Sequence, residues 1–210
     1  NKEHLLDTLV SKDKNLLLGW GLQIGNQEDY VATPYDGTTP SIEGINMMRT
    51  RAEFARALGD VETAAVWDRR AARAQSLLRE RLWMPDLGRF AFFVDPHGNR
   101  RFDGQYHALL YPVIWDVVDP LDAYTMLRHV HERLTGPGGE VYCSNNFPNH
   151  VGGTWGMQAG VAQQPWAAWA FSKAGQFDWT YQPLRAAARW AMDVNPRGAW
   201  PGVATESTPA

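Results

Sequence analysis

The stretch that decides the fold is TPSIEGINMMRTRAEFARALGDVETAAVWDRRAARAQSLLRERLW, residues 39–83. In its first half, apolar residues recur at helical spacing, at Ile45, Met48, Ala52, Ala55 and Leu58. Gly59 is expected to end that helix and Asp60 to open the next one. In the second half, one stripe of mainly apolar residues lies opposite arginines and glutamates. This pattern predicts an outer helix with one solvent-exposed face. That stripe holds Ala65, Arg69, Ala72 and Leu77.

Two further helix pairs follow the same plan. GQYHALLYPVIWDVVD (residues 104–119) precedes PLDAYTMLRHVHERL (120–134), and QPWAAWAFSKAGQ (164–176) precedes FDWTYQPLRAAARWAM (177–192). The turns fall near residues 59, 119 and 175, at a spacing of roughly 60 residues that suits stacked αα-hairpins. The predicted hairpins cover about 40–82, 104–134 and 154–194.

Long turn-rich connections separate the hairpins. The sequence predicts a strand at Arg89–Val94 that pairs with Asn99–Phe102 across the DPHGN turn, and a short strand at Glu140–Ser144. The predicted fold is therefore mostly α, with helical hairpins and short β-hairpins in the loops, and residues 1–210 form one domain. The loops at one end of such an array are the place for a binding or catalytic site.

Composition narrows the class of protein. The 210 residues carry a formal net charge of -3, with 44% hydrophobic and 20% charged residues, as in ordinary globular domains. This mild acidity gives no reason to expect nucleic acid or an anionic membrane as a partner. Cys143 is a single cysteine, which excludes an internal disulfide framework. No signal peptide is visible and no apolar run approaches membrane-spanning length, so we expect a cytoplasmic protein.

Aromatic and amide side chains are concentrated in GTWGMQAGVAQQPWAAWAF, residues 153–171. Indole rings cover the apolar C–H face of a sugar, and amides serve its hydroxyls as both donor and acceptor. We therefore expect Trp155, Gln158 and Gln164 to bind a carbohydrate. Trp166 and Trp169 fit this site as well, but they fit a core position between helices better.

Several stretches resemble the six-hairpin glycosidases, which include trehalases, processing-glucosidase relatives and bacterial α-L-rhamnosidases. One is the LGD turn (58–60), followed by an outer helix ending in LW (82–83) and a strand beginning GRF (88–90). PYDGTTPSIEG (34–44) is similar to the loop that carries the catalytic acid in those enzymes. AWPGVATES (199–207) is similar to the late loop that carries their base.

The resemblance implies an inverting glycoside hydrolase on an (α/α)6 toroid, with Asp36 as general acid and Glu206 as general base. A full toroid has six hairpins, and this chain supplies three. The resemblance therefore implies a partial barrel, the C-terminal half of a six-hairpin catalytic domain. The missing N-terminal half of the same enzyme would then be a partner, beside a small carbohydrate substrate.

The residues themselves support this chemistry, although each has a simpler explanation. Glycoside hydrolysis needs a carboxylic acid and a second carboxylate, and loop carboxylates near helix ends are suitable. Asp36 also fits a plain Asp-Gly turn, Glu206 a chain end, and Glu43 a first-turn residue favoured by the helix dipole. The expected substrate-binding residues are Glu28, Asp29, Tyr35, Gln105, His107, Trp155, Gln158, Gln164 and Trp200.

No cofactor or metal is expected. The His, Asp and Glu residues lack a recognisable metal spacing, and no glycine-rich phosphate loop occurs. The alternative function is a non-hydrolytic helical-barrel protein, namely a sugar-binding protein, an epimerase or a lyase. An epimerase would use histidines as general bases, and His107 and His150 would then be the candidates.

Overall fold

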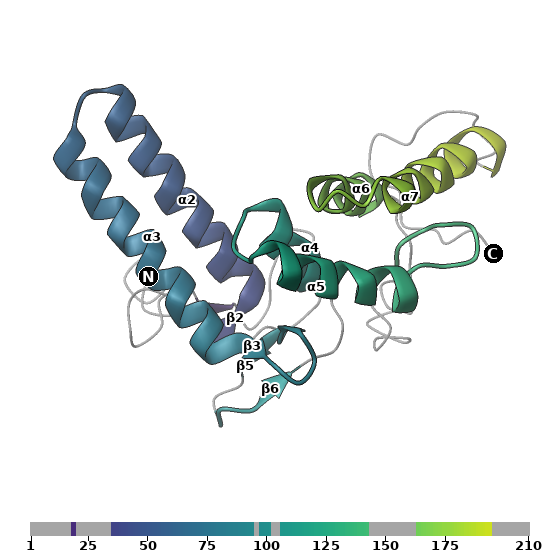
Figure 1. Ribbon diagram of the computed structural model, residues 1–210, viewed down its shortest axis with the longest axis horizontal. Coiled ribbons are helices and arrows are strands. Elements are labelled where there is room, and N and C mark those ends of the chain that lie inside the picture. Colours follow the sequence, from purple (N-terminus) through teal and green to yellow (C-terminus); the bar gives the residue numbers. More distant parts are fainter. Residues whose placement is uncertain (1–17, 20–34, 95–96, 102–105, 143–162, 195–210) are drawn as a thin grey trace, which may run out of the picture. The chain divides into compact units, whose positions relative to one another are not determined.

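The computed structural model describes residues 18–19, 35–94, 97–101, 106–142 and 163–194 (Figure 1). The chain divides into two compact units, Asn1–Phe102 and Asp103–Ala210. The three predicted helix pairs are present, one in the first unit and two in the second. The prediction that residues 1–210 form one half of a toroidal domain stays a prediction.

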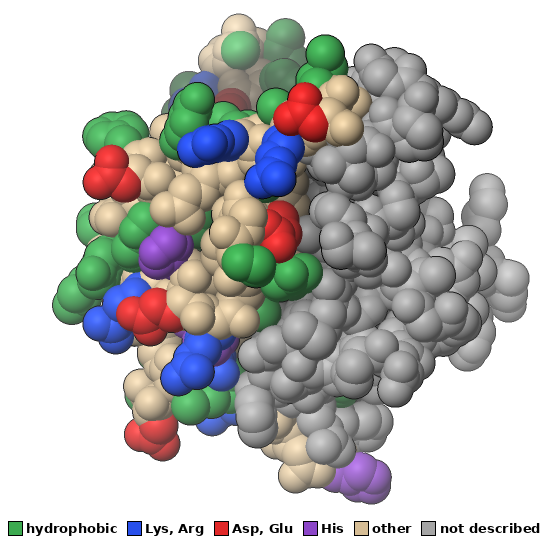
Figure 2. Space-filling model, turned by 90° about the vertical axis from the view of Figure 1, so that its right-hand side faces the viewer, with side chains coloured by type: hydrophobic (Ala, Val, Ile, Leu, Met, Phe, Trp, Pro, Cys, Tyr) green, Lys and Arg blue, Asp and Glu red, His purple; other side chains and the backbone are tan. Residues whose placement is uncertain are grey.

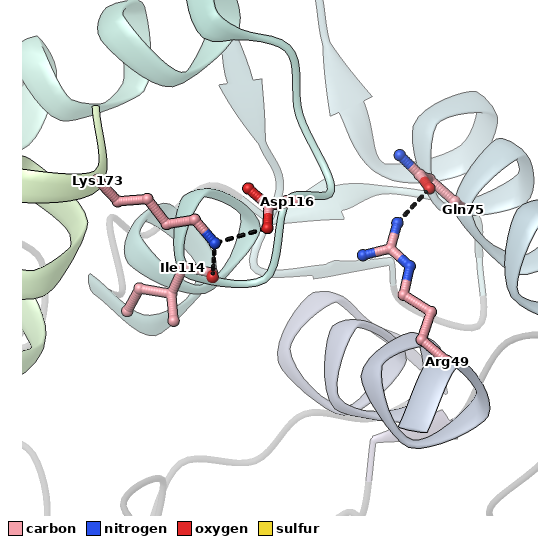
Figure 3. A network of polar contacts seen from close by, with 5 residues as sticks. All are labelled: Arg49, Gln75, Ile114, Asp116 and Lys173. Atoms are coloured by element: carbon pink, nitrogen blue, oxygen red, sulfur yellow. Dashed lines mark hydrogen bonds and ion pairs between the residues drawn. The ribbon is translucent and has the colours of Figure 1, made fainter. Parts of the chain in front are cut away.

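In the first unit, α2 (Thr38–Ala57) and α3 (Val61–Leu82) form an antiparallel pair (Figure 1). Arg49 on α2 donates to the Gln75 side chain on α3 at 2.8 Å, as Figure 3 shows. Nearer the turn, Arg56 and Asp68 form an ion pair at 2.7 Å. The pair is thus joined by polar contacts beside its apolar seam.

The apolar seam differs in part from its prediction. Ile45, Ala52 and Ala55 of α2 are buried as expected, but Leu58 is 85% exposed because it caps the helix end. On α3 the predicted stripe is wrong in part, since Leu77 is buried as expected but Arg69 and Ala72 are exposed. The buried positions of α3 are Ala64, Ala71, Ala74, Leu77, Leu78 and Leu82.

A four-stranded sheet lies at the base of this hairpin. Its order is β1 (Leu18–Gly19), β2 (Tyr35–Gly37), β5 (Phe93–Val94) and β6 (Arg100–Arg101), all antiparallel neighbours. The predicted pairing across the DPHGN turn is confirmed for β5 and β6. The single strand predicted at Arg89–Val94 is wrong, because β4 (Arg89–Phe90) pairs with β3 (Trp83–Met84) in a separate ladder.

The second unit contains α4 (Tyr106–Ile114), α5 (Pro120–Arg133), α6 (Gln163–Lys173), α7 (Phe177–Arg189) and a π-helical turn at Trp190–Val194. Helix α4 packs against both α5 and α6, and α6 packs against α7. Trp179 on α7 stacks on His131 of α5, with ring centroids 4.4 Å apart, and meets Phe171 of α6 edge-on. Its indole therefore joins three helices of this unit.

The strand predicted at Glu140–Ser144 is also wrong over its described part. Thr135 and Val141 form an isolated antiparallel bridge around the Gly136–Gly139 turn, and residues 143–144 lie outside the described residues. The Gly136 amide donates to the Glu140 carbonyl at 2.7 Å, and the Tyr142 amide donates to the Leu134 carbonyl at 2.7 Å. A Cβ added at Gly136 would clash with the Glu140 carboxylate, which lies against this turn.

Helices α2, α4 and α6 end in the same hydrogen-bonded motif. In each, the residue after the C-cap has a positive φ: 78° at Gly59, 52° at Asp116 and 72° at Gly175. The next amide then bonds back five residues, from Asp60 to Ala55, from Val117 to Pro112 and from Gln176 to Phe171. This pattern is the Schellman motif, which satisfies carbonyls that a helix end leaves open.

The motif at Asp116 places the second turn earlier than predicted. The sequence predicted the inner helix to reach Asp119, whereas α4 ends at Ile114 and Asp119 is the N-cap of α5. Lys173 of α6 donates to the Ile114 carbonyl and to the Asp116 carboxylate, both at 2.6 Å (Figure 3). Asp116 thus holds its left-handed backbone beside a salt bridge, in a position where the other two helices use glycine.

Candidate functional site

The structure describes the predicted site residues unevenly. Seven of them lie outside the described residues: Glu28, Asp29, Gln105, Trp155, Gln158, Trp200 and Glu206. For Tyr35, Asp36 and His107 the backbone is described, and Gln164 is described in full. The predicted pair of Asp36 and Glu206 therefore stays a prediction, and the site can be built from the Asp36 side alone.

Asp36 lies in strand β2, which corrects the prediction of an irregular loop. Its backbone is opposite Leu18 of β1 on one side and Val94 of β5 on the other. A strand with neighbours on both sides has a fixed backbone, so Asp36 starts from a defined position. Catalytic groups on rigid elements can be positioned more accurately than groups on free loops.

The chain passes directly from β2 into α2 at Gly37. Gly37 has extended backbone, at φ -97° and ψ 140°, and no side chain caps the helix start. Instead, Thr38 donates through its amide to Phe92 and through its hydroxyl to Ala91, while Ser41 donates back to the Gly37 carbonyl. These bonds fix the junction between strand and helix next to Asp36.

Thr39 is the residue that sequence reasoning missed at this junction. Thr39 is 4% exposed, and its hydroxyl has no hydrogen-bond partner among the described residues. A buried polar group without a partner costs free energy, so such groups are rare in folded proteins. The adjacent Thr38 is equally buried but fully bonded. The orphaned hydroxyl therefore marks the start of α2, three residues after Asp36, as a place of functional interest.

Glu43 belongs to the same helix end but not to its first turn. The sequence predicted a helix start near Pro40, whereas α2 begins at Thr38 and has no acidic residue in its first turn. Glu43 is exposed as a residue, yet its carboxyl loses part of its hydration, and this desolvation raises its pKa above the ordinary 4.5. A carboxyl with a raised pKa near a site is a candidate proton donor.

Gln164 has a structural role that its prediction as a sugar ligand did not foresee. It is 1% exposed, and its amide accepts from the Val141 amide at 2.7 Å and donates to the Val141 carbonyl at 3.0 Å. The side chain thus completes the backbone pairing of Val141 as a neighbouring strand would. Because both amide atoms serve Val141, we leave Gln164 out of the proposed site.

Four aromatic residues from α4, the turn after it and α6 form a continuous row, here called the aromatic strip: Tyr111, Trp115, Trp166 and Trp169. Trp166 is half-buried, but Trp169 is 45% exposed. The core position favoured for Trp169 is therefore wrong. Its exposure also means that Trp169→Ala should cost less than the roughly 3–5 kcal/mol expected for a buried tryptophan.

The first unit also carries an open groove of about 520 Å³ over α2 and α3. It is lined by Gly44, Asn46, Met47, Met48, Thr50, Arg51, Phe54 and Trp67. Sugar sites need several convergent polar groups, and this lining is chiefly apolar. The groove thus suits apolar side chains better than a polyol.

Charge and metal chemistry are less prominent on the described part of the chain. Basic and acidic side chains are interspersed with hydrophobic ones on the face in Figure 2. Among the described residues, no group of three or more His, Cys, Asp or Glu side chains could hold a metal ion. Within the same residues, no helix is both long and apolar enough to span a membrane.

Comparison with known proteins supports the fold. No family model matches the chain, and no curated protein matches it in sequence. Among solved structures, a rhamnosidase from Klebsiella oxytoca with rhamnose bound is similar at 12% identity, with a TM-score of 0.60. The match covers 88% of this chain but 30% of the rhamnosidase chain. This chain is therefore a mostly α protein of helical hairpins with short strands, and its fold is similar to that of part of the rhamnosidase.

Proposed function

We propose that this chain is part of the catalytic domain of a glycoside hydrolase that acts on a neutral sugar glycoside or oligosaccharide. The observation that carries the proposal is the likeness of most of the chain to a rhamnosidase with rhamnose bound. Asp36 supports the proposal as well, because its backbone is held in a paired strand directly before a long helix and its carboxylate is thus attached at a defined position. Because fold alone does not fix function, the proposal depends on the carboxylates.

The proposed mechanism is inverting. Asp36 protonates the leaving oxygen, and Glu206 removes a proton from the water that attacks the opposite face of the sugar ring. This geometry requires the two carboxyl groups to lie about 6.5–9.5 Å apart, which leaves room for the water. Tyr35, His107, Trp155 and Gln158 are proposed to bind the sugar, together with Glu28, Asp29, Gln105 and Trp200.

The position of Asp36 next to the start of α2 opposes its proposed role as an acid. A general acid needs a raised pKa, but the N-terminus of a helix favours the charged form of a nearby carboxylate. Asp36 precedes the N-cap of α2 by one residue, so burial in the complete site has to outweigh this effect. Glu43 already has a raised pKa from desolvation and is therefore the second candidate for the acid.

The test is release of the aglycone from a panel of aryl glycosides, including an aryl α-L-rhamnoside, with NMR to follow the first anomer formed. Asp36→Asn and Glu206→Gln should each lower kcat by about 10²–10⁴-fold with little change in KM. Glu43→Gln is assayed in parallel. If it abolishes activity while Asp36→Asn does not, the acid is Glu43.

A retained anomer would contradict the inverting mechanism. Failure of the purified protein to cleave any glycoside of the panel would favour the alternative, a non-hydrolytic sugar-binding protein, epimerase or lyase. In the epimerase case His107→Asn and His150→Asn would abolish isotope exchange at the sugar C–H, whereas Asp36→Asn would not.

A further inference from the structure

We propose that the aromatic strip, with Asp116 and Lys173 at one end, is a binding surface for the ring of a neutral sugar. The inference goes beyond the proposed function, because it assigns binding to residues of α4, the turn after it and α6, and does not depend on Asp36 or Glu206. The ligand class follows from the chemistry of these side chains.

The rings of the strip form a continuous row. Tyr111 lies 5.6 Å from Trp166, measured between ring centroids, and Trp166 lies 5.7 Å from Trp169 in a stacked arrangement. Trp115 then meets Trp169 at 5.6 Å and nearly at right angles. Each indole is held by its neighbours, so the row is a rigid apolar surface that a ligand need not order.

Exposure distinguishes this row from ordinary core packing. Tyr111 is almost fully buried and forms the base of the row, whereas Trp169 is 45% exposed. The Trp169 indole is held in place by its neighbours, yet nearly half of it is exposed to solvent, and a stacking ligand requires such a surface. The C–H face of a pyranose fits such a surface.

A fixed polar pair lies at the end of the strip. Lys173 is one helical turn after Trp169, and Asp116 directly follows Trp115 in sequence. The Lys173 ammonium and the Asp116 carboxylate are 2.6 Å apart, and the Asp116 side chain is 74% exposed. Together the pair offers both donors and acceptors to hydroxyls, while its charges cancel, which favours a neutral ligand.

The turn at Asp116 differs from the other two hairpin turns in its side chain. The equivalent positions of the other two hairpins hold Gly59 and Gly175, which adopt a positive φ without steric cost. Asp116 is the one non-glycine residue with positive φ in the described part of the chain. Asp adopts this backbone more readily than most non-glycine residues, so the turn keeps its conformation while it holds a carboxylate beside Lys173.

The same pair argues against a protein partner on this surface. A helix or sheet that covered the strip would take the exposed Asp116 carboxylate and its lysine out of water, which is costly for an ion pair. Sugar hydroxyls instead replace the water around both charges with hydrogen bonds. The strip is therefore better suited to a polyol than to a packed helix.

The experiment follows the tryptophan indole N–H signals in ¹H–¹⁵N spectra during titration with methyl α-L-rhamnoside and methyl glucosides. It uses the Asp36→Asn protein, so that turnover does not consume the probe. The signals of Trp115, Trp166 and Trp169 are assigned from the Trp→Phe variants. We expect saturable shifts of these signals, and Trp169→Ala should weaken binding of the best probe about tenfold.

Three further variants sharpen the test. Asp116→Gly keeps the turn, because glycine prefers this backbone, but removes the carboxylate, and Lys173→Met removes the ammonium. Each should weaken binding several-fold without unfolding the protein. Tyr181→Ala is the matched control, since Tyr181 is 68% exposed on α7 and has no place in the strip. It should leave the affinity unchanged.

Two outcomes would overturn the inference. One is the absence of any saturable shift of the three indoles up to the solubility limit of the sugars. The other is a shift that follows protein concentration instead of sugar, which would make the strip a self-association surface. Hydrolysis by the unaltered protein is measured separately. Lack of hydrolysis with intact strip binding therefore contradicts only the proposed function, and the reverse result contradicts only the strip.

Discussion

At the scale of single residues, Thr38 and Thr39 form a matched pair. Both are buried at the start of α2, but Thr38 donates to Ala91, whereas the Thr39 hydroxyl has no partner in the described part of the chain. Thr38→Val should destabilise the protein by about 1–3 kcal/mol, because it leaves a buried carbonyl short of a donor. Thr39→Val should be neutral or stabilising, since it replaces an orphaned hydroxyl with a methyl group of the same shape. Urea unfolding of both variants measures the difference, and equal losses would contradict the assignment.

Glu43 gives the protein a defined dependence on pH. Its pKa is raised in the folded state, so between the ordinary and the raised value the folded protein binds more protons than the unfolded chain. Stability from this group is therefore full below the ordinary value and falls as pH rises through the raised one. Glu43→Gln should melt like the unaltered protein in acid and at higher temperature near neutral pH. Glu53→Gln, a change at an exposed glutamate of the same helix, is the control.

Residues whose role depends on local backbone could be predicted from the sequence, whereas residues whose role depends on burial could not. The caps at Gly59, Asp60 and Asp119 depend on backbone within three or four residues, so local pattern was sufficient for Gly59 and Asp60. Thr39 and Glu43 depend on burial by distant parts of the chain. Thr38 bonds to Ala91, 53 residues away, and no local pattern shows which of two adjacent threonines finds a partner.

At the scale of elements, the three Schellman motifs allow a direct comparison. Gly59→Ala and Gly175→Ala should each cost about 1 kcal/mol from the left-handed backbone alone, because nothing lies within 4 Å of a Cβ added at either position. Asp116→Ala should cost more than Asp116→Gly, since alanine loses the salt bridge without relieving the backbone. Denaturant unfolding of the four variants tests this order. A gain in stability for Gly59→Ala would contradict it.

The positions of the helices were predicted better than the residues that each helix buries. The periodicity of α2 identified Ile45 and Ala55 as buried, because apolar residues recur there every three or four positions. In α3 many alanines separate the arginines, so two neighbouring stripes look alike, and the buried one runs through Ala71 and Ala74 instead of Ala72. Strand pairing was hardest, since the partner of β4 is a two-residue strand that follows α3 directly and is too short to show an alternating pattern.

At the scale of the whole molecule, the secondary structure itself is testable. Long helices occupy most of the described residues, and each described strand has two or three residues. Far-ultraviolet circular dichroism should therefore show a helical spectrum with little strand. A spectrum in which strand exceeds helix would contradict the fold. Heating should abolish the helical signal in a cooperative way if the hairpins pack into stable units.

The fold could be predicted from the sequence to a greater extent than the site. Helix pairs repeat along the chain, and each repeat carries its own signal in periodicity and capping residues. The proposed carboxylates instead lie 170 positions apart, at Asp36 and Glu206, and their meeting depends on how distant segments come together. The match also covers only 30% of the rhamnosidase chain. Most of that enzyme therefore has no counterpart in the sequence from which the site was predicted.

The turn between α2 and α3 makes the first hairpin separable. Leu58 and Val61 are both largely exposed, and Gly59 between them has open space around it. The helices on either side are held together by a buried seam and by the Arg49–Gln75 and Arg56–Asp68 contacts, none of which requires the connecting peptide. A new pair of chain ends at Gly59–Asp60 would thus leave the interface intact. Two separately expressed pieces, fused to the halves of a reporter, should reassemble there, which makes this turn the natural junction for a split version of the protein.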